Sequence, residues 1–356
     1  MRMAHPLRCE AEPTKSFQRL REFFGGKCWK NLSTAFAGDG LTSELTTALI
    51  EDPENAPLHA LLEMSTQLAG GTEVGNSYAA LLYLRQMANP QPYFVVDDNL
   101  VEILENIDIA DDVPVSMLTL PYQRFYVEFG KKRECSLMLP NTLSGLHTFE
   151  GAYVEQGLNE ILGEGIFVLL TGSPLGKSDV MDDATHSLFI PTADPARSVK
   201  DALASTFSKG KEIAADMGYI PTPSSFEARS LECVMLLTKA LLYIGLPEAR
   251  RLVNPAKTDW LAGLRALKSP GKRAKAYKKG RGLVDHIVIS AAENESTTGP
   301  AAGSTGRSVK SHWRRGHYRM QRHGPQLSLS KVVLLLPMLV HRESGEVPET
   351  PRYAVK

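Results

Sequence analysis

The residues best suited to chemistry in this chain lie close together near its carboxyl end. Residues 312–323 read HWRRGHYRMQRH and hold three histidines and four arginines. Guanidinium groups bind phosphates through paired hydrogen bonds, and aromatic rings stack on exposed bases. This combination predicts contact with RNA. The residues assigned to that contact are Arg314, Arg315, His317, Arg319 and Arg322, with Trp313 and Tyr318 as stacking groups.

The same histidines allow a catalytic alternative. A neutral imidazole accepts a proton and a protonated one donates it, so His312 and His317 could act as the base and acid of a metal-independent ribonuclease. A third interpretation is a protein-interaction scaffold whose basic segment docks on acids of its own chain. A linear motif does not supply the geometry that cleavage needs, so we expect a binding protein rather than an enzyme.

We expect no metal and no cofactor. His312 and His317 have the spacing of a zinc half-site, but no cysteine pair precedes them, and the adjacent arginines would oppose a cation. Residues 172–178 resemble a phosphate-binding loop, yet only three residues separate Gly172 from Gly176 where that motif needs four. The four cysteines show no CxxC spacing, which disfavours both a disulfide framework and a cysteine-rich zinc site.

The hydropathy pattern predicts a cytoplasmic protein without a membrane partner. No run of 18 apolar residues is present, so no transmembrane helix is expected. The amino-terminal residues lack the apolar core of a secretory signal. The scattered cysteines fit the same reducing, intracellular location.

Charge divides the chain although the net charge is zero. Residues 251–342 hold 18 Lys and Arg against four acids, a net of +14, whereas residues 1–250 carry a net of −13. Such asymmetry suggests a polyanionic partner for the basic part, or docking between the two parts. We therefore predict an acidic body, 1–250, and a basic carboxyl-terminal region, 251–356, that packs on it.

The body is predicted to be α+β, with a helical amino-terminal half and a mixed or antiparallel sheet that contains a hairpin. Apolar periodicity predicts helices in 57–68 and 76–89, a strand at 92–96 and a short helix at 99–105 capped by Asp97 or Asp98. Residues 113–129 are expected to form the hairpin, ending in a half-buried strand. In that strand Phe125, Val127 and Phe129 alternate with polar neighbours.

Further along, apolar residues at 166–171 and 186–190 predict two paired strands, followed by long helices at 195–218 and 224–244, the second of them buried. In the basic region we expect a short helix near 260–267, strands at 283–290 and 331–340, and a break at Pro337. Residues 268–282 and 291–311 have too few apolar side chains to pack and are predicted to be flexible loops.

Two motifs resemble those of a known family. The run His312-Trp-Arg-Arg-Gly-His-Tyr, which precedes a terminal apolar strand, is similar to the carboxyl-terminal signature of the type V-A anti-CRISPR family from mobile genetic elements, including phage. Leu120-Pro121 followed by Tyr126-Val127-Glu128 matches a second, weaker pattern of that family. The order of parts also agrees, from the helical half through the hairpin and long apolar helix to the His/Arg motif.

This resemblance implies a specific activity. A member of that family recognises the amino-terminal polypeptide of the CRISPR nuclease during translation, on the ribosome, and the messenger RNA is then degraded. We therefore expect an anti-CRISPR-like regulatory protein that binds a nascent target polypeptide and RNA. As a hypothesis of our own, the acidic body would bind the polypeptide by strand addition at 113–129, through Phe125, Tyr126 and Val127. The basic region would contact RNA.

Overall fold

The computed structural model describes residues 92–129, 137–141, 145–159, 163–173, 183–216, 224–279, 283–291, 312–314, 316–336 and 338–340. Within them the chain is α+β, as predicted. The helices expected at 57–68 and 76–89, and with them the helical amino-terminal half, lie outside the described residues. So does the loop predicted at 291–311, apart from Ala291.

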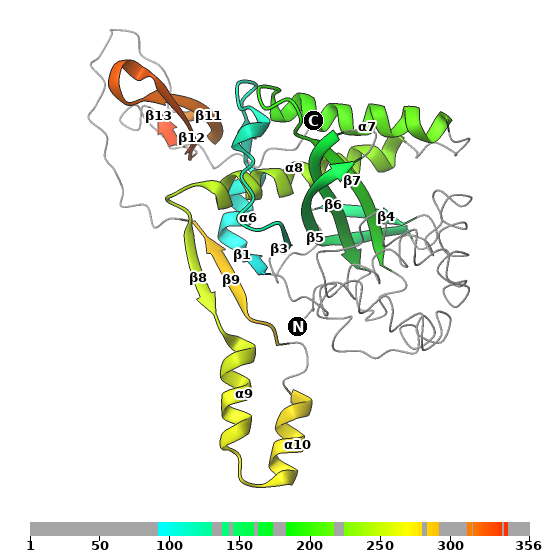
Figure 1. Ribbon diagram of the computed structural model, residues 1–356, viewed down its shortest axis with the longest axis vertical. Helices are drawn as coiled ribbons and strands as arrows, with labels where there is room; N and C mark the ends of the chain where they lie inside the picture. Colours follow the sequence, from blue (N-terminus) through cyan, green and yellow to red (C-terminus); the bar gives the residue numbers. More distant parts are fainter. Residues whose placement is uncertain are drawn as a thin grey trace.

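A mixed sheet of eight strands forms the centre of the molecule, in the order β7-β6-β5-β3-β1-β9-β8, with β4 also paired to β5 (Figure 1). The strands are β1 Tyr93–Val96, β3 Arg124–Phe129, β4 Met138–Asn141, β5 Gly145–Asn159, β6 Gly163–Ser173, β7 Ala184–Pro191, β8 Arg250–Asn254 and β9 His286–Ser290. Strand β1 runs parallel to both β3 and β9, and the other pairs are antiparallel. The predicted pairing of 166–171 with 186–190 is confirmed, with Ile166 opposite Ile190.

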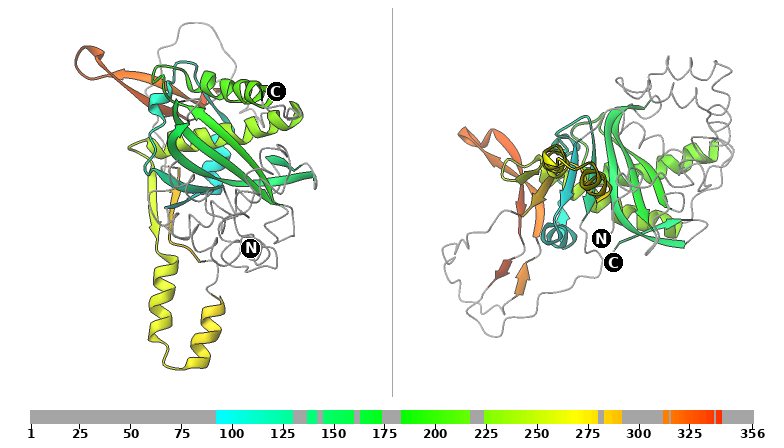
Figure 2. Two further views of the ribbon diagram at one scale, coloured as in Figure 1. Left: turned by 45° about the vertical axis from the view of Figure 1, so that its right-hand side comes forward. Right: turned by 90° about the horizontal axis from the view of Figure 1, so that it is seen from below.

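Three helices enclose the main core with the sheet: α6 Asp98–Glu105, α7 Val199–Asp216 and α8 Ser224–Gly245 (Figure 2). Helix α6 begins as predicted, because the Asp97 carboxylate accepts a hydrogen bond of 2.7 Å from the Leu100 amide. Helix α8 is apolar on most sides, and its residues from Cys233 to Ile244 are mostly buried, which confirms the expectation of a buried helix.

Strand β3 differs from the half-buried strand predicted. All six of its residues are buried, including Arg124, Tyr126 and Glu128 on the face opposite the helices. On that face Tyr126 packs against the Tyr93 and Tyr153 rings, whose centroids lie 5.3 and 4.8 Å away. Burial, and then the adjacent Glu128 carboxylate, raise the pKa of Tyr93, whose hydroxyl donates to Glu128 at 2.6 Å. The sheet is therefore covered on both faces at its centre.

The expected hairpin at 113–129 is also absent from the sheet. Residues Val115–Met117 form a short 3-10 helix, η2, and only β3 follows as a strand. The partners of β3 come from elsewhere in the chain: β1 on one side and β5 on the other. The backbone N–H and C=O groups on both edges of β3 are therefore bonded to neighbouring strands of its own sheet.

The loop predicted at 268–282 is largely helical. Helix α9 Ala256–Ala266 confirms the short helix expected there, and a second helix, α10 Pro270–Lys279, follows it to form a helical hairpin. Helix α10 has almost no apolar surface, but Ala, Lys and Arg have high intrinsic helix propensity. The Trp260 indole N–H also donates to the Ala276 carbonyl at 3.3 Å, which joins the two helices.

The carboxyl-terminal part forms a long β-hairpin beside the main sheet. It consists of β10 His312–Arg314, β11 Gly316–His323, β12 Leu329–Leu335 and β13 Met338–Val340, with the 3-10 turn η4 Pro325–Leu327 at its tip. Pairing of His312 with Val340 and of His317 with Leu335 belongs to one continuous register, interrupted near Pro337 as predicted. None of the helices described here is long and apolar enough to cross a membrane.

Candidate functional site

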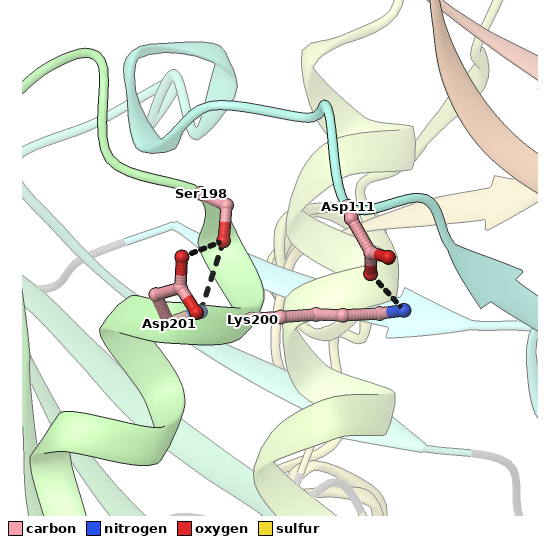
Figure 3. A network of polar contacts seen from close by, with 4 residues as sticks. All are labelled: Asp111, Ser198, Lys200 and Asp201. Atoms are coloured by element: carbon pink, nitrogen blue, oxygen red, sulfur yellow. Dashed lines mark hydrogen bonds and ion pairs between the residues drawn. The ribbon is translucent and has the colours of Figure 1, made fainter.

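The β-hairpin is attached to the body through strand β2 Ile107–Ile109, which runs parallel to β11. The loop after β2 is held against the start of α7 by backbone bonds between Val113 and Val199 and between Val115 and Arg197. In the same place Lys200 forms an ion pair of 2.6 Å with Asp111, and the Ser198 hydroxyl both accepts from the Asp201 amide and donates to its carboxylate (Figure 3). These contacts fix the base of the hairpin on the body.

Strand periodicity divides the predicted RNA-binding residues between two faces of β11. Tyr318 and Met320 face the core together with Val332 and Leu334 of β12. Tyr318 is 0% exposed, and its hydroxyl donates to the Lys239 carbonyl of α8 at 2.8 Å. Burial raises the pKa of Tyr318 well above its usual value. The prediction that Tyr318 stacks on bases is therefore wrong, because its ring is part of the core.

On the opposite face of the hairpin, β11 carries polar side chains, whereas β12 contributes Lys331 and three apolar residues, Leu329, Val333 and Leu335. Arg319 is exposed on this face, next to half-buried His317. On β12, Lys331 pairs with Gln321, so it joins the same face, and His323 completes it towards the tip. We call this set the hairpin face: His317, Arg319, Gln321, His323 and Lys331. Gln321, His323 and Lys331 were missed as site residues, although the alternation of side chains along a strand identifies them once β11 and β12 are recognised.

The remaining predicted residues are arranged differently. Arg322 is exposed on the Tyr318 side of β11, beyond the end of the buried cluster. Trp313 and Arg314 belong to β10, where their backbones pair with Leu339 and Met338. Arg315, and the side chains of His312, Trp313 and Arg314, lie outside the described residues. The pairing of His312 with His317 that a ribonuclease would need thus stays a prediction.

An acidic residue limits the positive charge at the base of the hairpin face. Asp108 of β2 is the register partner of His317 in the parallel pair. A negative charge at this place weakens the attraction of the base of the hairpin for phosphate. The cationic part of the hairpin face is therefore its outer half, with Arg319 and Lys331.

The predicted peptide site at Phe125, Tyr126 and Val127 is wrong. These residues are 2%, 0% and 0% exposed. The Phe125 ring packs edge-on against Phe94 with centroids 5.3 Å apart, and the Tyr126 hydroxyl bonds to Thr171 at 2.8 Å. Because β1 and β5 already bond both edges of β3, an incoming peptide has neither a free edge nor an accessible side chain to contact there.

Among the described strands, the same sheet has an exposed edge elsewhere. Strand β8 is terminal in the sheet order, and all five of its residues are exposed. Leu252 and Val253, which point to opposite faces of the strand, are 63% and 68% exposed. Figure 1 shows β8 along the outer margin of the sheet, with β9 on its inner side. The sequence RRLVN does not predict this edge, because it is too short to distinguish an edge strand from a turn.

The other terminal strand, β7, is fastened to helices. His186 donates from Nε2 to the Pro140 carbonyl at 3.0 Å, and its Nδ1 lies 2.6 Å from the Ser230 hydroxyl of α8. The Thr206 hydroxyl of α7 donates to the Phe189 carbonyl at 2.9 Å. Burial lowers the pKa of His186, which keeps this imidazole neutral near pH 7. Among the strands that the structure describes, β8 alone combines a terminal place in the sheet with exposure of all its residues.

Within the described residues, no three His, Cys, Asp or Glu side chains are grouped so that they could hold a metal ion. Two surfaces of the described residues are the site candidates: the hairpin face and the β8 edge.

Comparison with known proteins decides the family. The model of the AcrVA2-like family, described as the anti-CRISPR type V subtype A2 family, matches residues 94–342. The chain belongs to this family. The match begins in β1 and extends just past β13, so it includes both the β8 edge and the hairpin face.

Membership in the AcrVA2-like family confirms the resemblance inferred from the His/Arg motif. The crystal structure of AcrVA2 aligns with 95% of this chain and 99% of its own, at 14% sequence identity and a TM-score of 0.46. No curated protein matches the chain. Membership in the type V subtype A2 family supports an anti-CRISPR function for the protein.

Proposed function

We propose that this protein recognises the polypeptide of a type V-A CRISPR nuclease while it is being translated, and lowers production of the nuclease through its messenger RNA. Family membership supports the target class. The uncovered β8 edge is the observation that carries the recognition step. The protein acts as a binder, and degradation of the message is left to a nuclease of the host.

Recognition of a polypeptide at β8 follows from the chemistry of a sheet edge. The outer side of a terminal strand presents N–H and C=O groups that no neighbouring strand satisfies, and an extended peptide satisfies them by becoming the next strand. Leu252 and Val253 lie one on each face, so they offer apolar contacts to alternate side chains of the incoming segment. A nascent chain is extended and lacks a fold of its own, which suits this mode of binding.

Contact with RNA is assigned to the carboxyl-terminal hairpin. Arg319 and Lys331 on the hairpin face, and Arg322 on the other side, are exposed cations in a segment without acids of its own. His317 adds a donor at the base, and Arg314, Arg315 and Trp313 extend the contact along the preceding residues. Each phosphate neutralised on a single strand contributes roughly −0.7 to the slope of log affinity against log salt concentration. Three exposed cations thus give a slope of roughly −2 from the hairpin alone.

A pair of translational reporters tests recognition of the polypeptide directly. The first codons of a type V-A nuclease are fused to a fluorescent protein, and the control message carries one inserted nucleotide after the start codon and one deletion before the fusion point. The two messages have almost the same RNA sequence but encode different peptides. We expect the protein to lower the in-frame message only. Equal loss of both messages would contradict polypeptide recognition.

Purified protein mixed with labelled RNA in the absence of divalent metal separates this function from a metal-independent ribonuclease. We expect the RNA to be bound and to remain intact. Cleavage that disappears in His317→Ala, with binding retained, would instead establish the enzyme.

A further inference from the structure

The helical hairpin α9–α10 begins directly after β8 and concentrates positive charge near its far end. Residues 260–284 contain eight Lys and Arg and no acid. Around the turn between the helices, five of these side chains are exposed. We call them the arm tip: Arg265, Lys268, Lys272, Arg273 and Lys275. In Figure 1 the arm extends from β8 and β9 to one end of the molecule, and the carboxyl-terminal β-hairpin lies at the other.

The arm is braced along its length, so its cations have a fixed arrangement. At its base the Asp285 carboxylate accepts from the Lys257 and Thr258 amides at 2.9 and 3.0 Å and from the Thr258 hydroxyl at 2.6 Å. In the middle, Trp260 bonds to α10. At the tip the Arg273 guanidinium donates to the Leu267 carbonyl at 2.7 Å. These bonds hold the helices together although they share little apolar surface.

The composition of the arm surface indicates the class of partner. None of its described side chains is a large exposed hydrophobic group, and Leu264 is buried. Protein interfaces rely on apolar and aromatic anchors and are depleted in lysine, and membrane-surface helices need an apolar face to insert. Neither requirement is met here. A polymer of phosphates needs only well-placed cations, which the arm tip provides.

The arm tip also lacks what single-stranded RNA requires. Binding of a single strand depends on aromatic rings that stack on exposed bases, and residues 265–275, which form the turn and its flanks, include no aromatic residue; Trp260 bonds to α10. A duplex hides its bases and presents phosphates at regular spacing, so it is bound by shape and charge alone. A rigid cationic helix pair matches such an array.

We propose that the α9–α10 arm binds the phosphate backbone of double-stranded RNA, independently of sequence. This contact is separate from the β-hairpin and adds a second point of attachment to structured RNA, such as that of a ribosome or a folded message. It is compatible with the proposed function but does not depend on recognition of a nascent polypeptide.

The test measures binding of the full-length protein to a fluorescent RNA duplex of arbitrary sequence over a series of salt concentrations. The arm variant carries Arg265→Gln, Lys268→Gln, Lys272→Gln and Lys275→Gln; Arg273 is kept because it fastens the turn. Each lost contact with a duplex reduces the log–log slope by roughly 0.9, so four contacts reduce it by roughly 3.6. An unchanged slope and affinity would overturn the proposal.

Matched variants make the result specific. Replacement of Lys268, Lys272 and Lys275 by Arg keeps the charge and is expected to keep duplex binding. A hairpin variant with Arg319→Gln, Arg322→Gln and Lys331→Gln removes three charges elsewhere, against four in the arm variant, and should reduce the log–log slope for the duplex by less than three quarters of the reduction in the arm variant. All the substituted arm residues are exposed, so circular dichroism and the melting temperature should match those of the unsubstituted protein.

Other probes distinguish the remaining outcomes. Binding of the arm to anionic phosphatidylserine vesicles or to polyglutamate with higher affinity than to the RNA duplex would overturn the proposal. The in-frame reporter separates the two functions. If the unsubstituted protein binds the duplex through the arm but does not lower the in-frame reporter, the proposed function alone is refuted. If it lowers the reporter but the arm variant binds the duplex as well as the unsubstituted protein does, the arm proposal alone is refuted.

Discussion

Strands β3 and β8 belong to one sheet but have opposite surroundings. β3 is bonded on both edges and buried on both faces, whereas β8 is bonded on one edge and exposed at every residue. The aromatic, alternating sequence RFYVEF of β3 predicts a strand that could bind a peptide, whereas the sequence RRLVN of β8 predicts no strand. The comparison teaches that a strong strand signal reports packing: the side chains that make a strand easy to recognise are those that bury it. A binding edge must stay exposed, so its signal is weak.

The largest effect is expected from truncation of a β3 side chain. Phe125→Ala removes a buried ring that packs against Phe94 and leaves a cavity, which should lower the free energy of unfolding by about 3–5 kcal/mol. The matched change Leu252→Ala in β8 should alter it by no more than about 0.5 kcal/mol. Urea unfolding followed by circular dichroism measures both. Similar losses for the two variants would show that β8 is covered in solution.

The second terminal strand, β7, provides a test through pH. His186 fastens β7 to α8 and β4, and burial lowers its pKa, so the unfolded chain binds a proton more readily than the folded one. Stability from this group is complete above about pH 6.5 and is lost as pH falls from there to the folded pKa, by at most roughly 1.4 kcal/mol per pH unit. In His186→Gln that part of the pH dependence should disappear. If the pH dependence of the free energy of unfolding is unchanged in His186→Gln, it arises from other groups.

Local sequence signals predicted much of this fold. Apolar periodicity predicted β1, α6, β6, β7, α7, α8 and α9. In each of them the apolar pattern lies within the element's own sequence and can be recognised without knowing its neighbours in the fold. It failed for α10, where helix propensity and a bond from Trp260 replace an apolar face. It failed also for the second face of β3, since the tyrosines that cover Glu128 and Tyr126 come from β1 and β5, far apart in the sequence.

The candidate site was predicted less well than the fold, for a related reason. The residue types of HWRRGHYRMQRH predict which groups can bind RNA, but not which of them share a surface. A strand sends adjacent residues to opposite faces, so Tyr318 and Arg319 were never able to share one surface. Strand order could not be predicted either, because the strand that lies at the edge of a sheet is determined by pairings between distant segments.

A smaller effect is expected from the hydroxyl of Tyr126 in the centre of the sheet. Tyr126→Phe removes its hydrogen bond with Thr171, which retains a second bond to the Gly151 carbonyl at 3.1 Å. Because the ring is kept and Thr171 stays bonded, we expect a loss of about 1 kcal/mol in the free energy of unfolding. The reporter effect should be unchanged, because Tyr126 is remote from any accessible edge. A selective loss of reporter activity in this stable variant would restore β3 as a recognition strand.

The smallest effect on stability and the most specific effect on function are expected together at β8. Leu252→Ser with Val253→Ser leaves the backbone of the edge intact and removes only side chains that are already exposed, so the free energy of unfolding should change by less than about 0.5 kcal/mol. If the target polypeptide adds to this edge, the same change removes apolar contact made only in the complex. Affinity for the in-frame peptide should then fall on the order of tenfold.

The control for this double variant is Leu146→Ser, since Leu146 is 48% exposed but lies on β5, an interior strand of the sheet, opposite Pro140 of β4. Titration of the labelled peptide into each protein separates loss of a sheet edge from loss of exposed apolar surface in general. Equal weakening by the two variants would reduce β8 to one apolar patch among several. Loss of peptide affinity in the β8 variant alone would support strand addition, because β8 is a terminal strand whose outer backbone groups can pair with a peptide, whereas β5 is an interior strand.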